Sequence, residues 1–188
     1  MKNDIIQKIY ILVEEECKSE HNIFGYDAWD YHILSVVKNS KIMAEKLNAD
    51  KEIVEIAALL HDYAGIKNKD WYEEHHIYGA NEADIILTEL YYPREKIELV
   101  KKCIFSHRGS VVYDKLTNEE KCVTDADAMA HIDQVLSLLK LAYGLKGMGV
   151  NEGAKFVKAK LERSFNKMSK EAQEIMKEKY ELAQKILK

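Results

Sequence analysis

Ala57-Ala58-Leu59-Leu60-His61-Asp62 is an apolar run that ends in an imidazole and a carboxylate. From Ile53 onward the preceding residues are apolar on nearly every side of a helix, which is typical of a helix packed in the centre of a domain. Polar groups at the end of a buried helix need compensation for lost hydration, which a metal ion supplies. We therefore interpret His61 and Asp62 as adjacent metal ligands. Because successive helical residues point about 100° apart, the helix must end or distort here.

The composition predicts an all-α protein, a compact helical bundle. The 188 residues include one proline and eight glycines, so the chain holds few helix breakers. This length is usual for one domain, and we expect a single domain over residues 1–188. Within it, residues 27–145 would form the helical core around the metal site. Residues 1–20 and 152–188 would be flanking packing helices.

Apolar periodicity and capping residues place the individual helices. Asp50, the Thr117–Glu120 pair and Ser169 are typical of helix N-termini. Gly65 is expected to end the third helix in a left-handed turn. The predicted helices cover residues 4–17, 27–47, 51–62, 75–90, 93–106, 117–141, 153–168 and 170–187, and the segments 67–74 and 143–151 are predicted loops.

The charge pattern limits the possible partners, and the cysteines indicate the cellular compartment. The formal charge of −4 arises from 28 basic and 32 acidic residues spread along the chain, so no long nucleic acid is expected as a partner. No apolar run approaches the length of a membrane span, and the N-terminus lacks the apolar core of a signal peptide. Cys17, Cys103 and Cys122 have no paired spacing, which is typical of reduced, buried thiols. We expect a cytoplasmic protein with no membrane partner.

Several histidines lie on the apolar faces of predicted helices. His32 shares a face with Val36 in helix 27–47, so its ring is expected to point inward. His75 and His76 open the fourth predicted helix, and periodicity alone does not choose between them. His107 follows the apolar face of helix 93–106. Each is a candidate ligand.

Two carboxylates and a guanidinium complete the set of candidates. Asp125 and Asp127 both have a partly apolar helical face, and a buried aspartate without a counter-charge is costly. At least one of them is expected to face a cation. Arg108 follows His107, and beside a metal site it can grip a phosphate oxygen through two hydrogen bonds.

The order of these residues resembles that of the HD superfamily of metal-dependent phosphohydrolases, over residues 27–145. That family has a histidine, a His-Asp pair and a late aspartate, with two additional histidines in dinuclear members. Trp29-Asp30-Tyr31-His32 resembles its first-ligand helix, and the run ending in His61-Asp62 resembles its namesake motif. The resemblance favours His75, four residues before Gly79, over His76. It likewise favours Asp127 over Asp125.

The resemblance also implies a ligand set. One divalent metal would be held by His32, His61, Asp62 and Asp127. Asp62 would bridge to a second ion held by His75 and His107, or these two histidines would contact the substrate phosphate instead. Iron, manganese, cobalt, nickel and zinc all suit such ligands, at one or two ions per chain.

The implied activity is hydrolysis of a small phosphate ester, a nucleotide or related phosphomonoester, by metal-activated water. Asp62, Lys67 and Arg108 are the candidate catalytic residues, and His75, His107 and Arg108 the candidate substrate-binding residues. Many dinuclear members have a lysine three residues after the His-Asp aspartate, where this chain has Gly65. The alternatives are a di-iron oxygenase similar to inositol oxygenase and a non-catalytic nucleotide-binding regulatory module. The C-terminal helices would serve as scaffold or as the surface of a homodimer.

Overall fold

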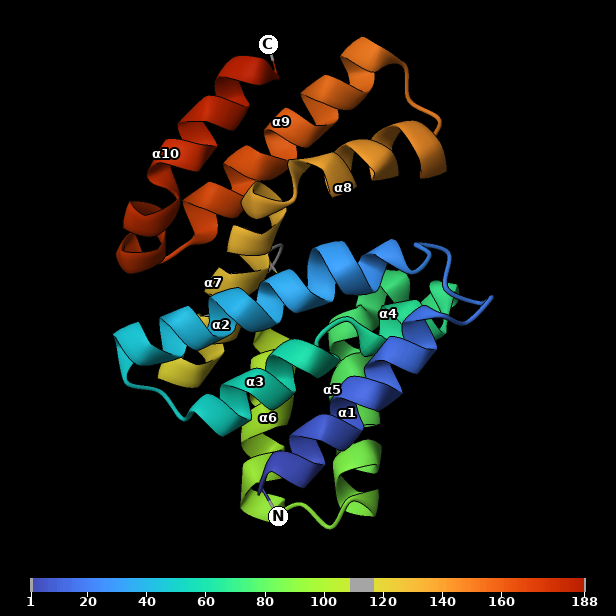
Figure 1. Ribbon diagram of the computed structural model, residues 1–188, viewed down its shortest axis with the longest axis vertical. Helices are drawn as coiled ribbons and strands as arrows, with labels where there is room; N and C mark the ends of the chain where they lie inside the picture. Colours follow the sequence, from blue (N-terminus) through green and yellow to red (C-terminus); the bar gives the residue numbers. More distant parts are fainter. Residues whose placement is uncertain (1, 109–116, 188) are drawn as a thin grey trace.

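The computed structural model describes residues 2–108 and 117–187, in which every regular element is a helix (Figure 1). The predicted all-α class is therefore confirmed. In chain order the elements are α1 (Lys2–Cys17), the π-helical η1 (Trp29–Ile33), α2 (Leu34–Leu47), α3 (Lys51–Leu60), α4 (Tyr63–Lys67), the 3-10 helix η2 (Lys69–Glu74), α5 (His75–Glu89), α6 (Arg94–Ser106), α7 (Asn118–Asp133), α8 (Val135–Lys140), the π-helical η3 (Leu141–Leu145), α9 (Val150–Lys167) and α10 (Lys170–Ile186).

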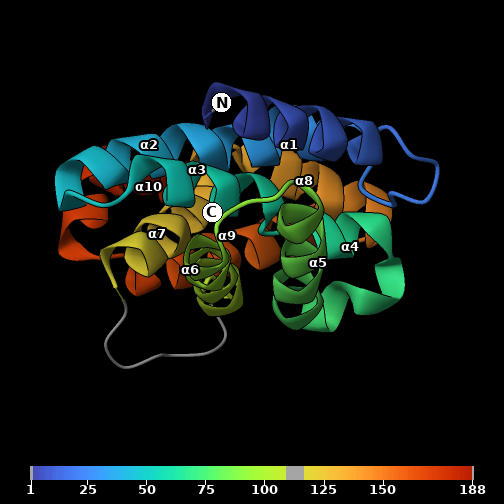
Figure 2. The ribbon, with the colours of Figure 1, turned by 90° about the horizontal axis from the view of Figure 1, so that it is seen from below.

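Helix α3 is the centre of the bundle. Asp50 caps its first turn by accepting hydrogen bonds from the backbone nitrogens of Glu52 and Ile53. Every residue from Ile56 to Leu60 is fully buried. Seen from below, α3 lies between α1 and α2 on one side and α6 and α7 on the other, and it contacts all four (Figure 2). The apolar run therefore forms a helix that is packed on all sides, as predicted.

The chain breaks where the sequence places the His-Asp pair. Helix α3 ends at Leu60, and Asp62 has φ −105° and ψ 2°, outside the helical region. This break lets two adjacent side chains point to one place. The expected left-handed turn at Gly65 is wrong, because the chain re-enters a helix at once and Gly65 lies inside α4.

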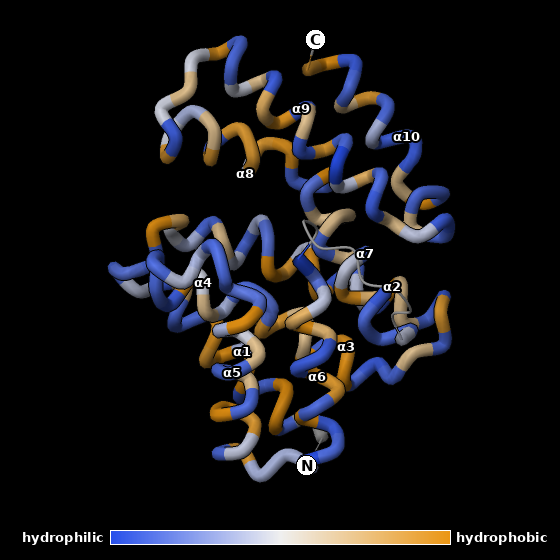
Figure 3. The backbone as a smooth tube through the Cα atoms, turned by 180° about the vertical axis from the view of Figure 1, so that it is seen from behind, coloured by the Kyte–Doolittle hydropathy of each residue, from blue (hydrophilic) through white to orange (hydrophobic). Residues whose placement is uncertain are grey.

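The C-terminal half departs from the expected helix boundaries. The predicted helix 117–141 is interrupted at Gln134, whose φ of −119° and ψ of 49° separate α7 from α8. Both predicted loops contain helical turns, η2 in the first and part of η3 in the second. Helices α9 and α10 lie side by side and both contact α7 (Figure 1). Polar and apolar segments alternate along both, so each has one face that packs and one that meets water (Figure 3).

Within the described ranges, no helix has the combination of length and apolar character needed to cross a membrane.

Candidate metal centre

The carboxylate of Asp62 lies in the middle of a group of four imidazoles. Its Oδ2 is 3.1 Å from Nε2 of His32 and 3.4 Å from Nε2 of His61. Its Oδ1 is 3.3 Å from Nε2 of His75 and 3.6 Å from Nε2 of His107. Each oxygen therefore faces its own pair of histidines, and the pairs come from η1, the end of α3, the start of α5 and the end of α6.

The spacing within each pair fits a shared metal ion. The Nε2 atoms of His32 and His61 are 3.1 Å apart, and those of His75 and His107 are also 3.1 Å apart. Two nitrogens bound to one ion at about 2.0–2.1 Å lie roughly 3 Å apart at ordinary coordination angles. Imidazole nitrogens and carboxylate oxygens are donors that divalent transition metals accept. The side chains present thus fit two ions, with Asp62 between them.

Backbone carbonyls orient three of the four rings. Nδ1 of His61 donates to the carbonyl oxygen of Ala58 at 2.8 Å, Nδ1 of His75 to that of Tyr72 at 2.6 Å, and Nδ1 of His107 to that of Ile104 at 2.5 Å. In each case the carbonyl lies three residues earlier, at the last turn before the histidine. A proton fixed on Nδ1 leaves the Nε2 lone pair free for a metal.

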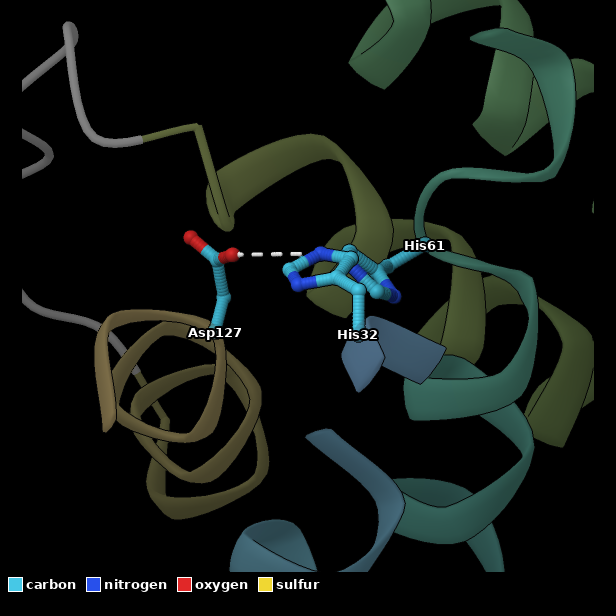
Figure 4. Close-up of side chains that lie close together, drawn as sticks. All are labelled: His32, His61 and Asp127. Carbon is cyan, nitrogen blue, oxygen red and sulfur yellow. Dashed lines mark hydrogen bonds and ion pairs between the residues drawn. The ribbon is translucent and has the colours of Figure 1, made fainter. Parts of the chain in front are cut away.

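Asp127 lies beside the first pair of histidines, His32 and His61. Its Oδ1 is 3.7 Å from Nε2 of His32, and Figure 4 shows the carboxylate of α7 facing the rings of His32 and His61. Its Oδ2 accepts a 2.8 Å hydrogen bond from Nζ of Lys167, and the same ammonium is 3.5 Å from the carbonyl oxygen of His107. One oxygen of Asp127 is therefore held by α9, and the other faces the histidines.

Asp125, the alternative to Asp127, serves the packing of the helices. Its two oxygens accept hydrogen bonds from the backbone nitrogen of Ser169, at 2.8 Å, and from its hydroxyl, at 2.6 Å. The same hydroxyl caps α10 by accepting from the backbone nitrogen of Ala172. Asp125 thus fixes the junction of α9 and α10 to α7, and it is engaged away from the imidazoles.

The charges of the cluster depend on one another. Burial alone would lower the pKa of His61, but the charge and hydrogen bond of Asp62, the charge of Asp127 and the bond to Ala58 together outweigh it and raise this pKa to about 9. Burial of His107 prevails and lowers its pKa to about 4, so that ring is neutral at pH 7. Burial opposes the charged form of Asp62, yet the surrounding imidazoles hold its pKa well below the ordinary value. A divalent cation would take the place of the proton that His61 otherwise holds.

Two cavities meet at this cluster. The first is mainly apolar, and its walls include the rings of Phe24, Tyr31 and Tyr72. The second contains five basic side chains, which are Arg108, Lys146, Lys160, Arg163 and Lys167. The cavities share six residues at their junction, which are Asp62, Tyr72, His75, His131, Leu141 and Lys160. The arrangement can bind a small molecule whose flat apolar part lies in the first cavity and whose anionic part lies in the second. The candidate metal ligands would then lie between the two parts.

The structure does not bring every predicted residue to the cluster. Lys67 pairs with Glu82 at 2.8 Å and lies over the ring of Tyr63, and it lines neither of these cavities. Arg108 lines the basic cavity, but its guanidinium is also bonded to Glu73. The predicted catalytic role of Lys67 therefore lacks geometric support, whereas Arg108 remains a candidate for substrate binding.

Of the two adjacent histidines, His75 faces Asp62 and His107, whereas His76 packs against the ring of Phe105. His76 is buried, and its Nδ1 has no hydrogen-bond partner within the described ranges. The preference for His75 as the candidate ligand agrees with this geometry.

Helix α9 carries site residues that the sequence reasoning missed. Lys160, Arg163, Ser164 and Lys167 recur at the spacing of one helical face and line the basic cavity. Ser164 also bonds Nδ1 of His131 at 3.0 Å, and Nε2 of that ring is 3.6 Å from Oδ1 of Asp127. The expectation that residues 152–188 only pack is thus incomplete. The spacing of these four polar residues was the available signal.

Comparisons with known proteins identify a domain family over the part of the chain that carries the candidate ligands. The model of the HD domain matches residues 29–132, which is more than half of the chain. That range contains all six candidate ligands and ends before α9. The comparison with curated proteins gives no significant match.

Solved structures with the same architecture span nearly the whole chain. YpgQ from Bacillus subtilis is 23% identical with a TM-score of 0.75, over 99% of this chain and 93% of that one. YpgQ in complex with ADP is 26% identical with a TM-score of 0.66, over 96% and 93%. A predicted HD superfamily hydrolase from an uncultured Thermotogales bacterium is 21% identical with a TM-score of 0.64, over 96% and 88%. With the domain match over residues 29–132, these findings show that the chain belongs to the HD-domain family.

Proposed function

We propose that the protein is a metal-dependent phosphohydrolase that acts on a small phosphate ester, with a nucleotide as the first candidate. The observation that carries the proposal is the position of Asp62, whose two oxygens each face a pair of imidazoles. Such a centre would supply Lewis-acid activation of a phosphoryl group and a nucleophilic water at neutral pH. His32, His61 and Asp127 would hold one ion, His75 and His107 the other, and Asp62 both.

The two cavities favour a substrate with an organic group and a phosphate. Aromatic side chains in the first cavity can stack on a nucleobase, since a planar ring gains from contact with other rings. Basic side chains in the second cavity can neutralise phosphate oxygens. A polyol, one of the two substrates expected of an oxygenase, has no charge for them to pair with, whereas a phosphonate does. The basic cavity therefore supports hydrolysis over oxidation of a polyol.

A structural relative adds support for a nucleotide, because YpgQ has been solved in complex with ADP. We extend this ligand class to the present chain as part of the proposal. The described cysteines are free and buried, which agrees with the reducing cytoplasm that we propose as its location.

The proposal is tested by a phosphatase screen of protein purified without chelator. We expect phosphate or diphosphate release from nucleoside mono-, di- or triphosphates, loss of that release on metal removal, and its return when Mn²⁺, Co²⁺ or Fe²⁺ is added. Oxygen consumption with iron and a polyol or phosphonate, without release of phosphate from the esters, would instead support the oxygenase. Tight nucleotide binding without turnover under any metal would support a regulatory module.

A further inference from the structure

Lys160 occupies a distinctive place on the inner face of α9. It is one of the six residues that line both cavities, beside the candidate ligands Asp62 and His75. It is also the only lysine or arginine among those six. A substrate that extends from the apolar cavity into the basic one would pass this ammonium.

The ammonium has no hydrogen bond or ion pair with any of the residues 2–108 and 117–187. Burial disfavours its charge and lowers the pKa of Lys160, although the carboxylates of Asp127 and Asp62 act in the opposite direction. Lys160 is half-buried, and a cation that loses part of its hydration without gaining a partner is costly to keep. An anionic ligand would offset that cost.

The neighbouring carboxylates already have other partners. Oδ2 of Asp127 accepts from Lys167 at 2.8 Å, and the oxygens of Asp62 face four imidazoles. Two other cations of the basic cavity are engaged, since Lys167 holds Asp127 and Arg108 is bonded to Glu73. Lys160 is thus a cation at the junction whose charge remains available to a ligand.

We propose that Lys160 is a substrate-binding residue that contacts an oxygen of the phosphoryl group where the two cavities meet. The inference rests on the proposed function, because it names the residue that receives the anionic part of that substrate. Lys160 lies beyond residues 29–132, so this role belongs to the C-terminal helices and not to the matched HD domain.

The test measures binding of inorganic phosphate to metal-loaded protein by isothermal titration calorimetry. Lys160→Met keeps the length of the side chain and removes the charge, and we expect its affinity for phosphate to fall at least about 10-fold, as for a lost charge-assisted hydrogen bond. Lys160→Arg should stay within about 3-fold of the wild type because the cation is kept. Lys155→Met, at an exposed position of the same helix, is the matched control and should not change the affinity.

Metal content is measured on every variant and should not change. Unaltered phosphate affinity in folded Lys160→Met would overturn the inference, as would loss of metal, which would make Lys160 a support of the metal centre. Lys160→Gln provides a second neutral variant if the methionine variant does not fold. Phosphate binding that depends on Lys160, in a protein that hydrolyses no ester, would leave this inference standing and refute the proposed function.

Discussion

Asp62→Asn is expected to abolish both metal binding and hydrolysis. Among the residues that the structure describes, Asp62 is the one carboxylate that faces both pairs of imidazoles, with Oδ2 on His32 and His61 and Oδ1 on His75 and His107. An amide offers a single neutral oxygen and turns an NH₂ group toward one of the pairs. Loss of a group that only hydrogen-bonds to a metal ligand typically lowers metal affinity 10–100-fold. Loss of a ligand shared by both ions should therefore lower metal affinity more than about 100-fold.

The metal content of Asp62→Asn can be measured by elemental analysis of protein purified without chelator. Asp70→Asn removes an exposed carboxylate of η2 and should keep full metal and activity. In metal-free Asp62→Asn, burial of His61 acts with less opposition, so the pKa of His61 should fall from about 9, which an NMR titration would show. A variant with wild-type metal content would refute the role given to Asp62.

The second large effect distinguishes the role of Asp127 from that of Asp125, which lies on the same helix. Asp127→Asn should lower metal affinity more than about 100-fold, because it neutralises the carboxylate that faces His32 and leaves Lys167 without its counter-charge. Asp125→Asn should keep the metal and lower the free energy of unfolding by about 1–3 kcal/mol, because it weakens the bonds to Ser169.

Metal titration and thermal unfolding of both variants check this assignment. Equal metal affinity in the two variants would contradict it, and loss of metal in Asp125→Asn alone would reverse it. The comparison is informative because both residues are buried in α7, so a general disturbance of that helix should affect them alike.

Local patterns were sufficient to predict the fold and much of the candidate ligand set. The fully apolar face of α3 indicated a central helix, and the cost of burying His61 and Asp62 at its end indicated a metal. The choices of His75 and Asp127 came from the resemblance to a family, because periodicity left both open. Contacts between distant helices, which a helical wheel does not contain, distinguish the two aspartates in the structure, because Asp125 bonds Ser169 whereas Asp127 faces His32.

The residues that were missed depend on packing between distant segments. Lys160 and Lys167 reach the centre only because α9 lies across α7, and no local pattern fixes that placement. Lys67 illustrates the converse, since its position near the His-Asp pair in sequence suggested a catalytic role, yet its ammonium pairs with Glu82. The π-helical turn that carries His32 was also not predicted, because π-helical segments are rare and have no clear sequence signature.

The central claim is that Asp62 joins two metal positions. The most direct measurement is the number of metal ions per chain, determined by elemental analysis of wild-type protein and of the His75→Ala/His107→Ala double variant. The account predicts two ions in the wild type and one in the variant. One ion in the wild type, unchanged in the variant, would contradict it and make His75 and His107 contacts for the substrate.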